Sequence, residues 1–246
     1  MNQEENGIRL NKYIAEAGIC SRREADKLIA DRRVKIDGNI AKTGTKIQNG
    51  QKVTVDGKLI SKEEKQIYLA FYKPRGIVCT EDRNEKHNII DYIKYPKRIT
   101  YCGRLDKDSE GLIIMTNDGD LANRMMRSKY GHEKEYQVSL DHPIKEVLIE
   151  GIKKGVYLPE LNVTTKPCEA SRIDEKRMRL ILTQGLNRQI RRMCEQFGYE
   201  VKRLVRTRVM NITTEGLKVG SYRELTRKEM QELREMLDHK KESKGK

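Results

Sequence analysis

The sequence lacks the features that membrane insertion and secretion require. Its 246 residues contain no run of about 18 apolar residues and no strongly amphipathic basic helix. The first seven residues include neither a basic segment nor an apolar one, so they do not predict a secretory signal. We therefore expect a cytoplasmic protein that does not bind a membrane.

Cysteine and histidine are present, but not in the patterns that bind metals. The five cysteines are scattered, odd in number and never spaced as Cys-x-x-Cys, which argues against a disulfide framework and against structural zinc. The four histidines include no pair at ligand spacing, which disfavours both a histidine metal site and a Ser-His-Asp triad. Carboxylates are the side chains expected to carry any chemistry, and no metal site is expected.

Positive charge is what the sequence has in excess. Lys and Arg number 51 against 37 Asp and Glu, which gives a formal net charge of +14. This balance favours a polyanionic partner, and nucleic acid ranks above an anionic membrane surface. The chain length predicts one large domain and one small domain.

Residues 8–61 predict a small domain of two helices followed by a short sheet. Apolar residues recur at helical spacing at the start of this segment, and Gly18 ends the first helix. Ser21 and Glu24 have the spacing of a capping box, which begins the second helix. Further along, Asp56-Gly57 follows an alternating segment and indicates a tight hairpin turn.

The same segment is strongly basic. Residues 8–60 contain 12 Lys and Arg against 6 Asp and Glu, although charge alone leaves a solvated basic face as the alternative to RNA binding. The run at 9–26 resembles the small RNA-binding domain shared by a ribosomal small-subunit protein, tyrosyl-tRNA synthetases and several RNA-modifying enzymes. The RNA-binding residues that this resemblance implies are Arg9, Lys12, Arg22, Arg23 and Lys27.

Residues 66–237 predict a larger α+β domain after a polar linker at 61–65. The expected strands are 67–72, 112–115, 135–140 and 178–183, and the expected helices are 120–126 and 188–197. Because these strands are mostly not separated by regular crossover helices, we expect a mixed, mainly antiparallel sheet with flanking helices. Residues 238–246 are expected to form a disordered basic tail.

The stretch 103–119 contains the residue best placed for chemistry. A polar, glycine-bounded turn precedes an apolar strand, so Asp106 is expected on a loop held by rigid elements. An isolated Asp beside Gly and Ser would more often cap a turn. However, Gly-Arg-Leu-Asp at 103–106, continued through Thr-Asn-Asp-Gly at 116–119, resembles the signature of pseudouridine synthases. It resembles most the ribosomal RNA group of RsuA, RluB, RluE and RluF, and within it the RluF-like branch.

Three other stretches resemble motifs of the same family in the same order. Lys73-Pro74-x-Gly76 is similar to its opening motif, although alone it indicates only a turn. Residues 133–136 resemble the motif that supplies an active-site tyrosine, here Tyr136; an aromatic residue on a strand is more often core. Residues 184–193 resemble the motif that supplies a basic partner for the catalytic carboxylate, here Arg191.

Additional RNA contacts follow from position. Residues 185–208 contain seven basic residues against two acidic ones, which predicts phosphate contacts, although a solvated helical face remains an alternative. Leu204 falls where the family places an apolar residue under the target base, and ordinary strand core is an equally good interpretation. The RNA-binding residues assigned to this domain are Arg104, Arg188, Arg192 and Leu204.

The resemblance implies a cofactor-free monomer that isomerises uridine to pseudouridine in ribosomal RNA. Large-subunit RNA is the favoured target, and a tRNA stem-loop is a second candidate. Asp106 can act as a nucleophile at the ribose anomeric carbon or as a base on a neighbouring ribose proton. Arg191 would favour its ionised form, and Tyr136 would stack on the base and transfer a proton.

Two other functions compete with this interpretation. A non-catalytic, ribosome-associated RNA-binding protein would explain the charge, but it would not explain why Asp106, Tyr136 and Arg191 occur in family order. An RNA hydrolase with paired carboxylates ranks last, because Asp106 and Asp108 lie too close on one loop to serve as separate acid and base.

Overall fold

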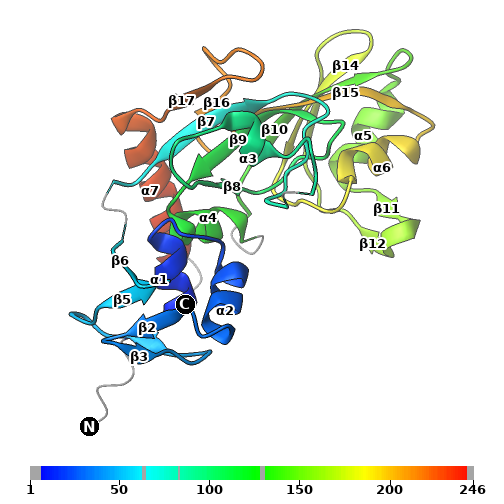
Figure 1. Ribbon diagram of the computed structural model, residues 1–246. Coiled ribbons are helices and arrows are strands. Elements are labelled where there is room, and N and C mark those ends of the chain that lie inside the picture. Colours follow the sequence, from blue (N-terminus) through cyan, green and yellow to red (C-terminus); the bar gives the residue numbers. More distant parts are fainter. Residues whose placement is uncertain (1–6, 63–64, 83, 128–130, 243–246) are drawn as a thin grey trace. The chain divides into compact units, whose positions relative to one another are not determined.

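The computed structural model describes residues 7–62, 65–82, 84–127 and 131–242 (Figure 1). The chain forms two compact units. The first unit consists of the described part of Met1–Ile67 together with Tyr95–Thr100 and Asn117–Gly119, and the second consists of the remaining described residues.

The first unit contains two helices and a small antiparallel sheet, as the sequence predicts. The sheet has the strand order β3-β2-β5-β6, and β1 pairs separately with β4. The elements are β1 (Ile8–Arg9), α1 (Leu10–Glu16), α2 (Arg22–Ala30), β2 (Val34–Ile36), β3 (Asn39–Ile40), β4 (Lys46–Ile47), β5 (Val53–Val55) and β6 (Lys58–Ile60).

Local sequence signals account for these elements. The Ser21 hydroxyl accepts a hydrogen bond from the Glu24 N–H (3.2 Å), and the Glu24 carboxylate accepts one from the Ser21 N–H (2.8 Å), so the predicted capping box is present. Asp56 and Gly57 both have positive φ (50° and 78°), which suits the two-residue turn between β5 and β6. The buried faces of α1 and α2 pack on the sheet through an apolar cluster that includes Leu10, Ile14, Ala25 and Ile29.

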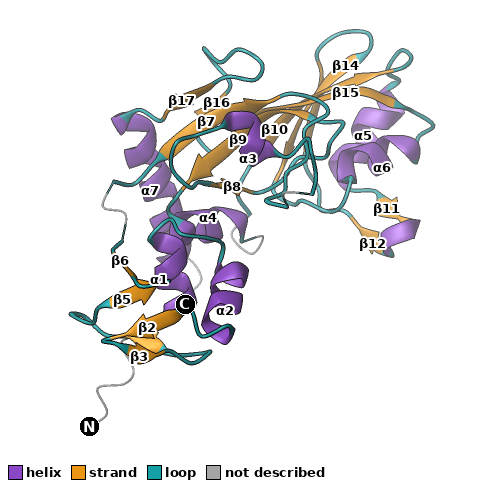
Figure 2. Cartoon of the chain, viewed as in Figure 1, coloured by secondary structure: helices purple, strands orange, loops and turns teal. Residues whose placement is uncertain are grey.

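The second unit is built on a nine-stranded mixed sheet (Figure 2). Its main strand order is β13-β14-β10-β15-β9-β7-β17, with β16 on β15 and β8 on β9. The strands are β7 (Tyr68–Lys73), β8 (Thr100–Cys102), β9 (Glu110–Thr116), β10 (Lys134–Leu140), β13 (Glu169–Arg172), β14 (Arg177–Leu182), β15 (Val201–Val209), β16 (Ile212–Thr213) and β17 (Tyr222–Glu224).

Pairing in this sheet is mainly antiparallel, as expected. The neighbours β13–β14, β14–β10, β10–β15, β9–β7 and β7–β17 are antiparallel, whereas β9 and β15 are parallel. The other elements of this unit are α3 (Ile89–Ile93), α4 (Gly119–Met126), α5 (Glu146–Lys154), β11 (Tyr157–Leu158), a 3₁₀ helix (Pro159–Leu161), β12 (Val163–Thr164), α6 (Gln189–Glu195) and α7 (Arg227–Glu242). The α+β prediction is therefore confirmed.

Two apolar clusters hold helices against this sheet. In the first, α5 and α6 pack on β10, β14 and β15 through residues such as Leu148, Val138, Leu180 and Met193. In the second, α4 and α7 pack on β7 and β9 through residues such as Leu121, Leu233, Ala70 and Ile114. Each fully buried aliphatic side chain of this kind contributes about 1.5–3 kcal/mol.

The expected strands and helices occur within a few residues of their predicted bounds. The helices α3, α5 and α7 and several short strands were not among the expected elements, and β15 was anticipated only through the strand-core interpretation of Leu204. The predicted tail at 238–246 is wrong where it can be compared, because α7 continues to Glu242. Glu, Lys, Met and Leu dominate α7 and are strong helix formers, so the helix continues past its apolar residues. Residues 243–246 lie outside the described part of the chain.

Among the described residues, no helix is both long and apolar enough to cross a membrane.

Candidate active site

The loop at 103–109 joins β8 to β9, and other segments of the second unit hold it in place. The Gly76 N–H donates to the Lys107 carbonyl (2.7 Å), and the Leu105 N–H donates to the Cys79 sulfur (3.4 Å). Within the loop, the Ser109 N–H donates to the Asp106 carbonyl (3.1 Å). The opening motif and the segment that follows it are therefore bonded directly to the loop that carries Asp106.

A buried lysine shapes the opening motif. The Lys73 ammonium donates to the carbonyls of Pro74 (2.9 Å) and Ile77 (2.8 Å), and the side chain is fully buried. Burial lowers the pKa of Lys73, while the nearby carboxylates of Asp106 and Asp108 oppose that shift. Lys73 therefore closes the turn of its own motif by hydrogen bonds, and its ammonium also interacts electrostatically with the carboxylates of the Asp106 loop.

Asp106 is half-buried, and its side chain has no partner among the residues that the structure describes. No hydrogen bond or ion pair to its carboxylate is formed by any residue in the described ranges, whereas the neighbouring Asp108 carboxylate lies 3.1 Å from Arg191 Nη2 and 3.4 Å from Arg188 Nη1. Arg191 and Arg188 thus both pair with Asp108, and Asp106 keeps its carboxylate oxygens available.

Arg191 joins α6 to the loop and to the start of β15. Its side chain is 8% exposed, and its Nη1 donates to the Val201 carbonyl (2.7 Å). Its Nη2 also donates to the Asp108 carbonyl (3.3 Å). Burial lowers the pKa of Arg191, and the charges of Asp108 and Asp106 partly offset this effect. The ion pair is with Asp108, so a direct role as the partner of Asp106 stays a prediction.

Tyr136 lies on β10, in a row of residues paired across three neighbouring strands that ends on β9, next to the Asp106 loop. It is half-buried, packs against the cluster under α5 and α6, and is opposite Arg206 of β15. Arg206 is in turn opposite Gly111 of β9, five residues after Asp106. The register therefore places Tyr136 two strands away from the strand that follows the loop. Leu204, on the same face of β15, is 6% exposed and belongs to the apolar cluster, as its core interpretation expects.

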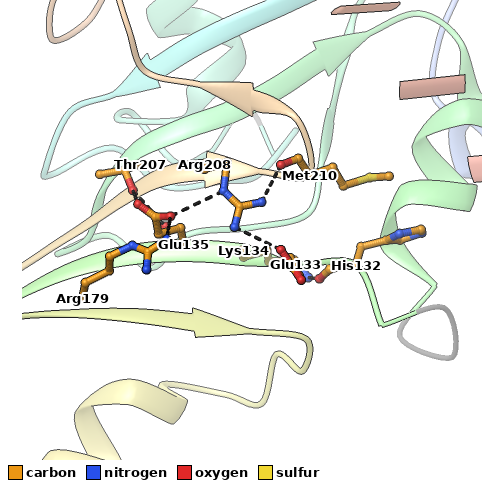
Figure 3. Close-up of polar contacts among 8 residues, drawn as sticks. All are labelled: His132, Glu133, Lys134, Glu135, Arg179, Thr207, Arg208 and Met210. Atoms are coloured by element: carbon orange, nitrogen blue, oxygen red, sulfur yellow. Dashed lines mark hydrogen bonds and ion pairs between the residues drawn. The ribbon is translucent and has the colours of Figure 1, made fainter. Parts of the chain in front are cut away.

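The residue next to Tyr136 fixes this strand on its other face. The Glu135 carboxylate accepts hydrogen bonds from Arg179 (2.8 Å) and Thr207 (3.1 Å) and lies 3.5 Å from Arg208 (Figure 3). Although burial opposes it, the hydrogen bond and charge of Arg179 hold the pKa of Glu135 below its usual value. The bonds from Arg179 of β14 and Thr207 of β15 therefore tie β10 to both neighbouring strands at the position of Tyr136.

The predicted RNA-binding residues differ in their environments. Arg104 is exposed, Arg188 contacts Asp108, and Arg192 is paired with Glu160 and donates to the Asn187 carbonyl. In the first unit, Lys12 lies 3.5 Å from Glu16. Four exposed side chains there form no ion pair within the described chain, namely Arg9, Arg22, Arg23 and Lys27.

Asp108 and Arg206 are the residues that sequence reasoning missed. Asp108 was considered only as a second carboxylate for hydrolysis, and Arg206 was counted only as part of a basic stretch. The spacing of two between Leu204 and Arg206 places both on one face of a strand, and this was the one available signal.

Replacing Arg191 by alanine is expected to lower kcat by about 100-fold, because the loop loses its tie to α6 and a buried charge near the carboxylate. RNA affinity should change much less. Steady-state kinetics and RNA binding measured on the same preparation test this. Arg177→Ala is the matched control, since Arg177 is exposed and pairs only with Asp174 in a turn. A loss of affinity with unchanged kcat would instead make Arg191 a phosphate contact.

The chain belongs to the RNA pseudouridylate synthase family. The family model described as RNA pseudouridylate synthase matches residues 67–196, and the model of the S4 domain matches residues 8–52. The family resemblance and the two-part organisation predicted from the sequence are confirmed, while the boundaries 8–61 and 66–237 stay predictions. The chain is an RNA pseudouridine synthase, and RNA is its substrate.

Individual relatives cover nearly the whole chain. The dual-specificity RNA pseudouridine synthase RluF of Escherichia coli K12 is 46% identical over 237 residues, which are 96% of this chain and 81% of that protein. The ribosomal large subunit pseudouridine synthase B of Bacillus subtilis 168 is 35% identical over 95% of this chain and 98% of that protein. A crystal structure of a pseudouridylate synthase is 31% identical with a TM-score of 0.67, covering 92% of this chain and 99% of that one. These likenesses do not favour the non-catalytic alternative.

Proposed function

We propose that this enzyme converts a specific uridine of large-subunit ribosomal RNA to pseudouridine, with a tRNA stem-loop as a second substrate. The target is supported by two relatives, one named as dual-specific and one as a large-subunit enzyme. In this proposal the enzyme acts as a monomer in the cytoplasm, without a cofactor.

Asp106 is the reacting carboxylate in this proposal. The supporting observation is a carboxylate that no described residue pairs with, on a loop that is itself held by hydrogen bonds, beside two arginines that pair with Asp108. The reaction breaks the bond between uracil N1 and the ribose anomeric carbon and forms a bond from C5 to that carbon. The C5 proton leaves to solvent, and N1 takes up a proton from solvent, so that the atoms balance. Asp106 either attacks the anomeric carbon or removes a neighbouring ribose proton.

Arg191 and Tyr136 support this step from the two flanking elements. The Arg191 guanidinium, held in a mostly buried position, contacts both the carboxylate and the carbonyl of Asp108 and so ties the loop to α6. Tyr136 offers an aromatic face for the base and a hydroxyl for proton transfer. Both side chains lie on elements that pack in the same apolar cluster, so their positions are set by the core.

Isomerisation is tested with RNA that carries tritium at C5 of uridine. Isomerisation releases the label as water, whereas RNA binding or hydrolysis of the backbone does not. Sequencing of pseudouridine in RNA from cells with and without the protein tests the target. Loss of a small-subunit modification, with large-subunit RNA unchanged, would contradict the proposed target and leave the chemistry intact.

The paired change of Arg22 and Arg23 to alanine is expected to weaken RNA binding and to flatten its salt dependence by roughly one unit of slope per lost phosphate contact. Both side chains are exposed and form no ion pair within the described chain. Titrations at several salt concentrations measure the slope. Arg33→Ala is the control, because Asp56 already neutralises Arg33 at 2.6 Å. Equal slopes for the double variant and the unchanged enzyme would remove this pair from the RNA interface.

A further inference from the structure

Arg206, in the middle of β15, is the largest of the fully buried side chains, with 2% of its surface exposed. A buried guanidinium is normally paired with a carboxylate. Within the described chain Arg206 has no ion pair. Its Nε donates to the Leu112 carbonyl (2.7 Å), and its Nη1 lies 3.5 Å from the Arg104 carbonyl. Its Nη2 has no hydrogen-bond partner among the described residues.

This arrangement does not stabilise the fold in an obvious way. Removing a guanidinium from water is costly, and main-chain carbonyls compensate for it less well than a carboxylate does. An apolar residue of similar length at such a position is often neutral or stabilising. The presence of Arg206 therefore points to a role other than stability.

The position of Arg206 indicates what that role is. It lies opposite Tyr136 on one side and opposite Gly111 on the other. The Arg104 carbonyl that it contacts is two residues before Asp106. One side chain thus links the strand next to Tyr136 both to the first half of the Asp106 loop and, through Leu112, to the strand that follows the loop.

We propose that Arg206 is a positioning residue for the reaction. Its planar fork holds the main chain at 104–106 against β9 and so fixes the position of the Asp106 carboxylate relative to Tyr136. The inference rests on the proposed roles of Asp106 and Tyr136. A misplacement of about 1 Å is enough to slow a well-aligned reaction by about 100-fold.

Arg206→Met tests this directly, because methionine fills much of the same space without a charge or a donor. We expect the melting temperature to be unchanged or higher, kcat at saturating RNA to fall by about 100-fold, and the RNA dissociation constant to stay within about threefold. Tritium release gives kcat and KM, and binding to unlabelled RNA gives affinity. A merely structural role would not lower kcat in a protein of equal or greater stability.

Arg208→Met is the matched control on the same strand. Arg208 is half-buried, it contacts Glu133, Glu135 and the Met210 carbonyl (Figure 3), and Glu135 would keep its bond to Arg179. Its kcat should remain close to that of the unchanged enzyme. An equal loss of kcat in both variants would show a general effect of changing β15 and would overturn the inference.

Arg206→Lys keeps the inference testable if the methionine variant does not fold. Lysine retains the charge, but it lacks the fork that reaches the two carbonyls, so kcat should still fall while affinity is kept. Three outcomes would each overturn the proposal. They are full activity in Arg206→Lys, activity of Arg206→Met within about threefold of the unchanged enzyme, and a loss confined to RNA affinity. Activity that survives in Asp106→Asn would instead refute the proposed function, so the two failures can be distinguished.

Discussion

Asp106→Asn is expected to abolish isomerisation while RNA affinity stays within a few-fold of the unchanged enzyme. Asparagine preserves the shape of the side chain and removes the charge that the reaction needs. Because no described residue pairs with this carboxylate, the loop should keep its conformation. Tritium release should slow by at least about 1,000-fold, equal to about 4 kcal/mol of activation free energy.

The same substitution two residues along the loop is the informative comparison. Asp108→Asn removes the partner of Arg188 and Arg191 but leaves the proposed reacting carboxylate, so a smaller loss of about tenfold is expected. Both variants should be compared at saturating RNA, together with their affinities. An active Asp106→Asn enzyme beside an inactive Asp108→Asn enzyme would exchange the roles of the two residues.

Gly111→Ala is expected to destabilise the second unit by about 4 kcal/mol or more, because two mechanisms act at one position. Gly111 has a φ of 111°, which L residues rarely adopt. An added Cβ would lie 2.6 Å from the main-chain nitrogen of Arg206 and closer still to its carbonyl oxygen, so β9 and β15 would have to separate. Urea denaturation followed by a probe within the second unit measures the change.

Gly119→Ala provides the control for this change. Gly119 is the first residue of α4, and the other residues of that helix belong to the second unit. It has no positive φ, and an added Cβ would meet nothing within 4 Å. Alanine favours a helix interior over glycine by about 1 kcal/mol, and a smaller gain is expected at the end of a helix. Stability should therefore be unchanged or slightly higher. A Gly111→Ala protein as stable as the Gly119→Ala protein would mean that the two strands can separate there at little cost.

Local signals in the sequence predicted what neighbouring residues determine. The capping box at Ser21, the hairpin at Asp56-Gly57 and the apolar strand 112–115 all depend on contacts within a few residues, and all are present. The motif resemblance likewise placed Asp106, Tyr136 and Arg191 on elements that the fold brings to one region of the second unit.

Elements whose patterns depend on distant partners were missed. Helix α5 contains Gly151, and glycine is unfavourable in helices. Glycine is needed at this position because an added Cβ would collide with the ring of Phe197, a residue distant in the sequence. Strand β15 carries so many charged residues that it was interpreted mainly as a basic surface, with strand core considered at Leu204 alone. Its charges are accommodated by neighbours from across the sheet, such as Glu110 for Arg203 and the Leu112 carbonyl for Arg206.

The choice of Asp108 as the ion-pair partner of Arg191 also could not be predicted. Two aspartates separated by one residue have the same local chemistry, and the backbone turn decides which of them meets the guanidinium. Here the Ser109 N–H bonds back to the Asp106 carbonyl, and Arg191 contacts both the carbonyl and the carboxylate of Asp108. Only the folded loop distinguishes the two carboxylates.

The hydrogen bonds that hold the Asp106 loop in place also determine whether the enzyme or the RNA must change its conformation when the substrate binds. Three segments contact the main chain of this loop: the connection after β7 through Gly76 and Cys79, α6 through Arg191, and β15 through Arg206. A loop restrained in this way cannot reach toward a base stacked inside a helix, so the nucleotide has to leave its stack, which costs the RNA a few kcal/mol. The enzyme should therefore discriminate among uridines by how easily their own strand releases them, and loop or bulge uridines should react faster than the same uridine in a duplex.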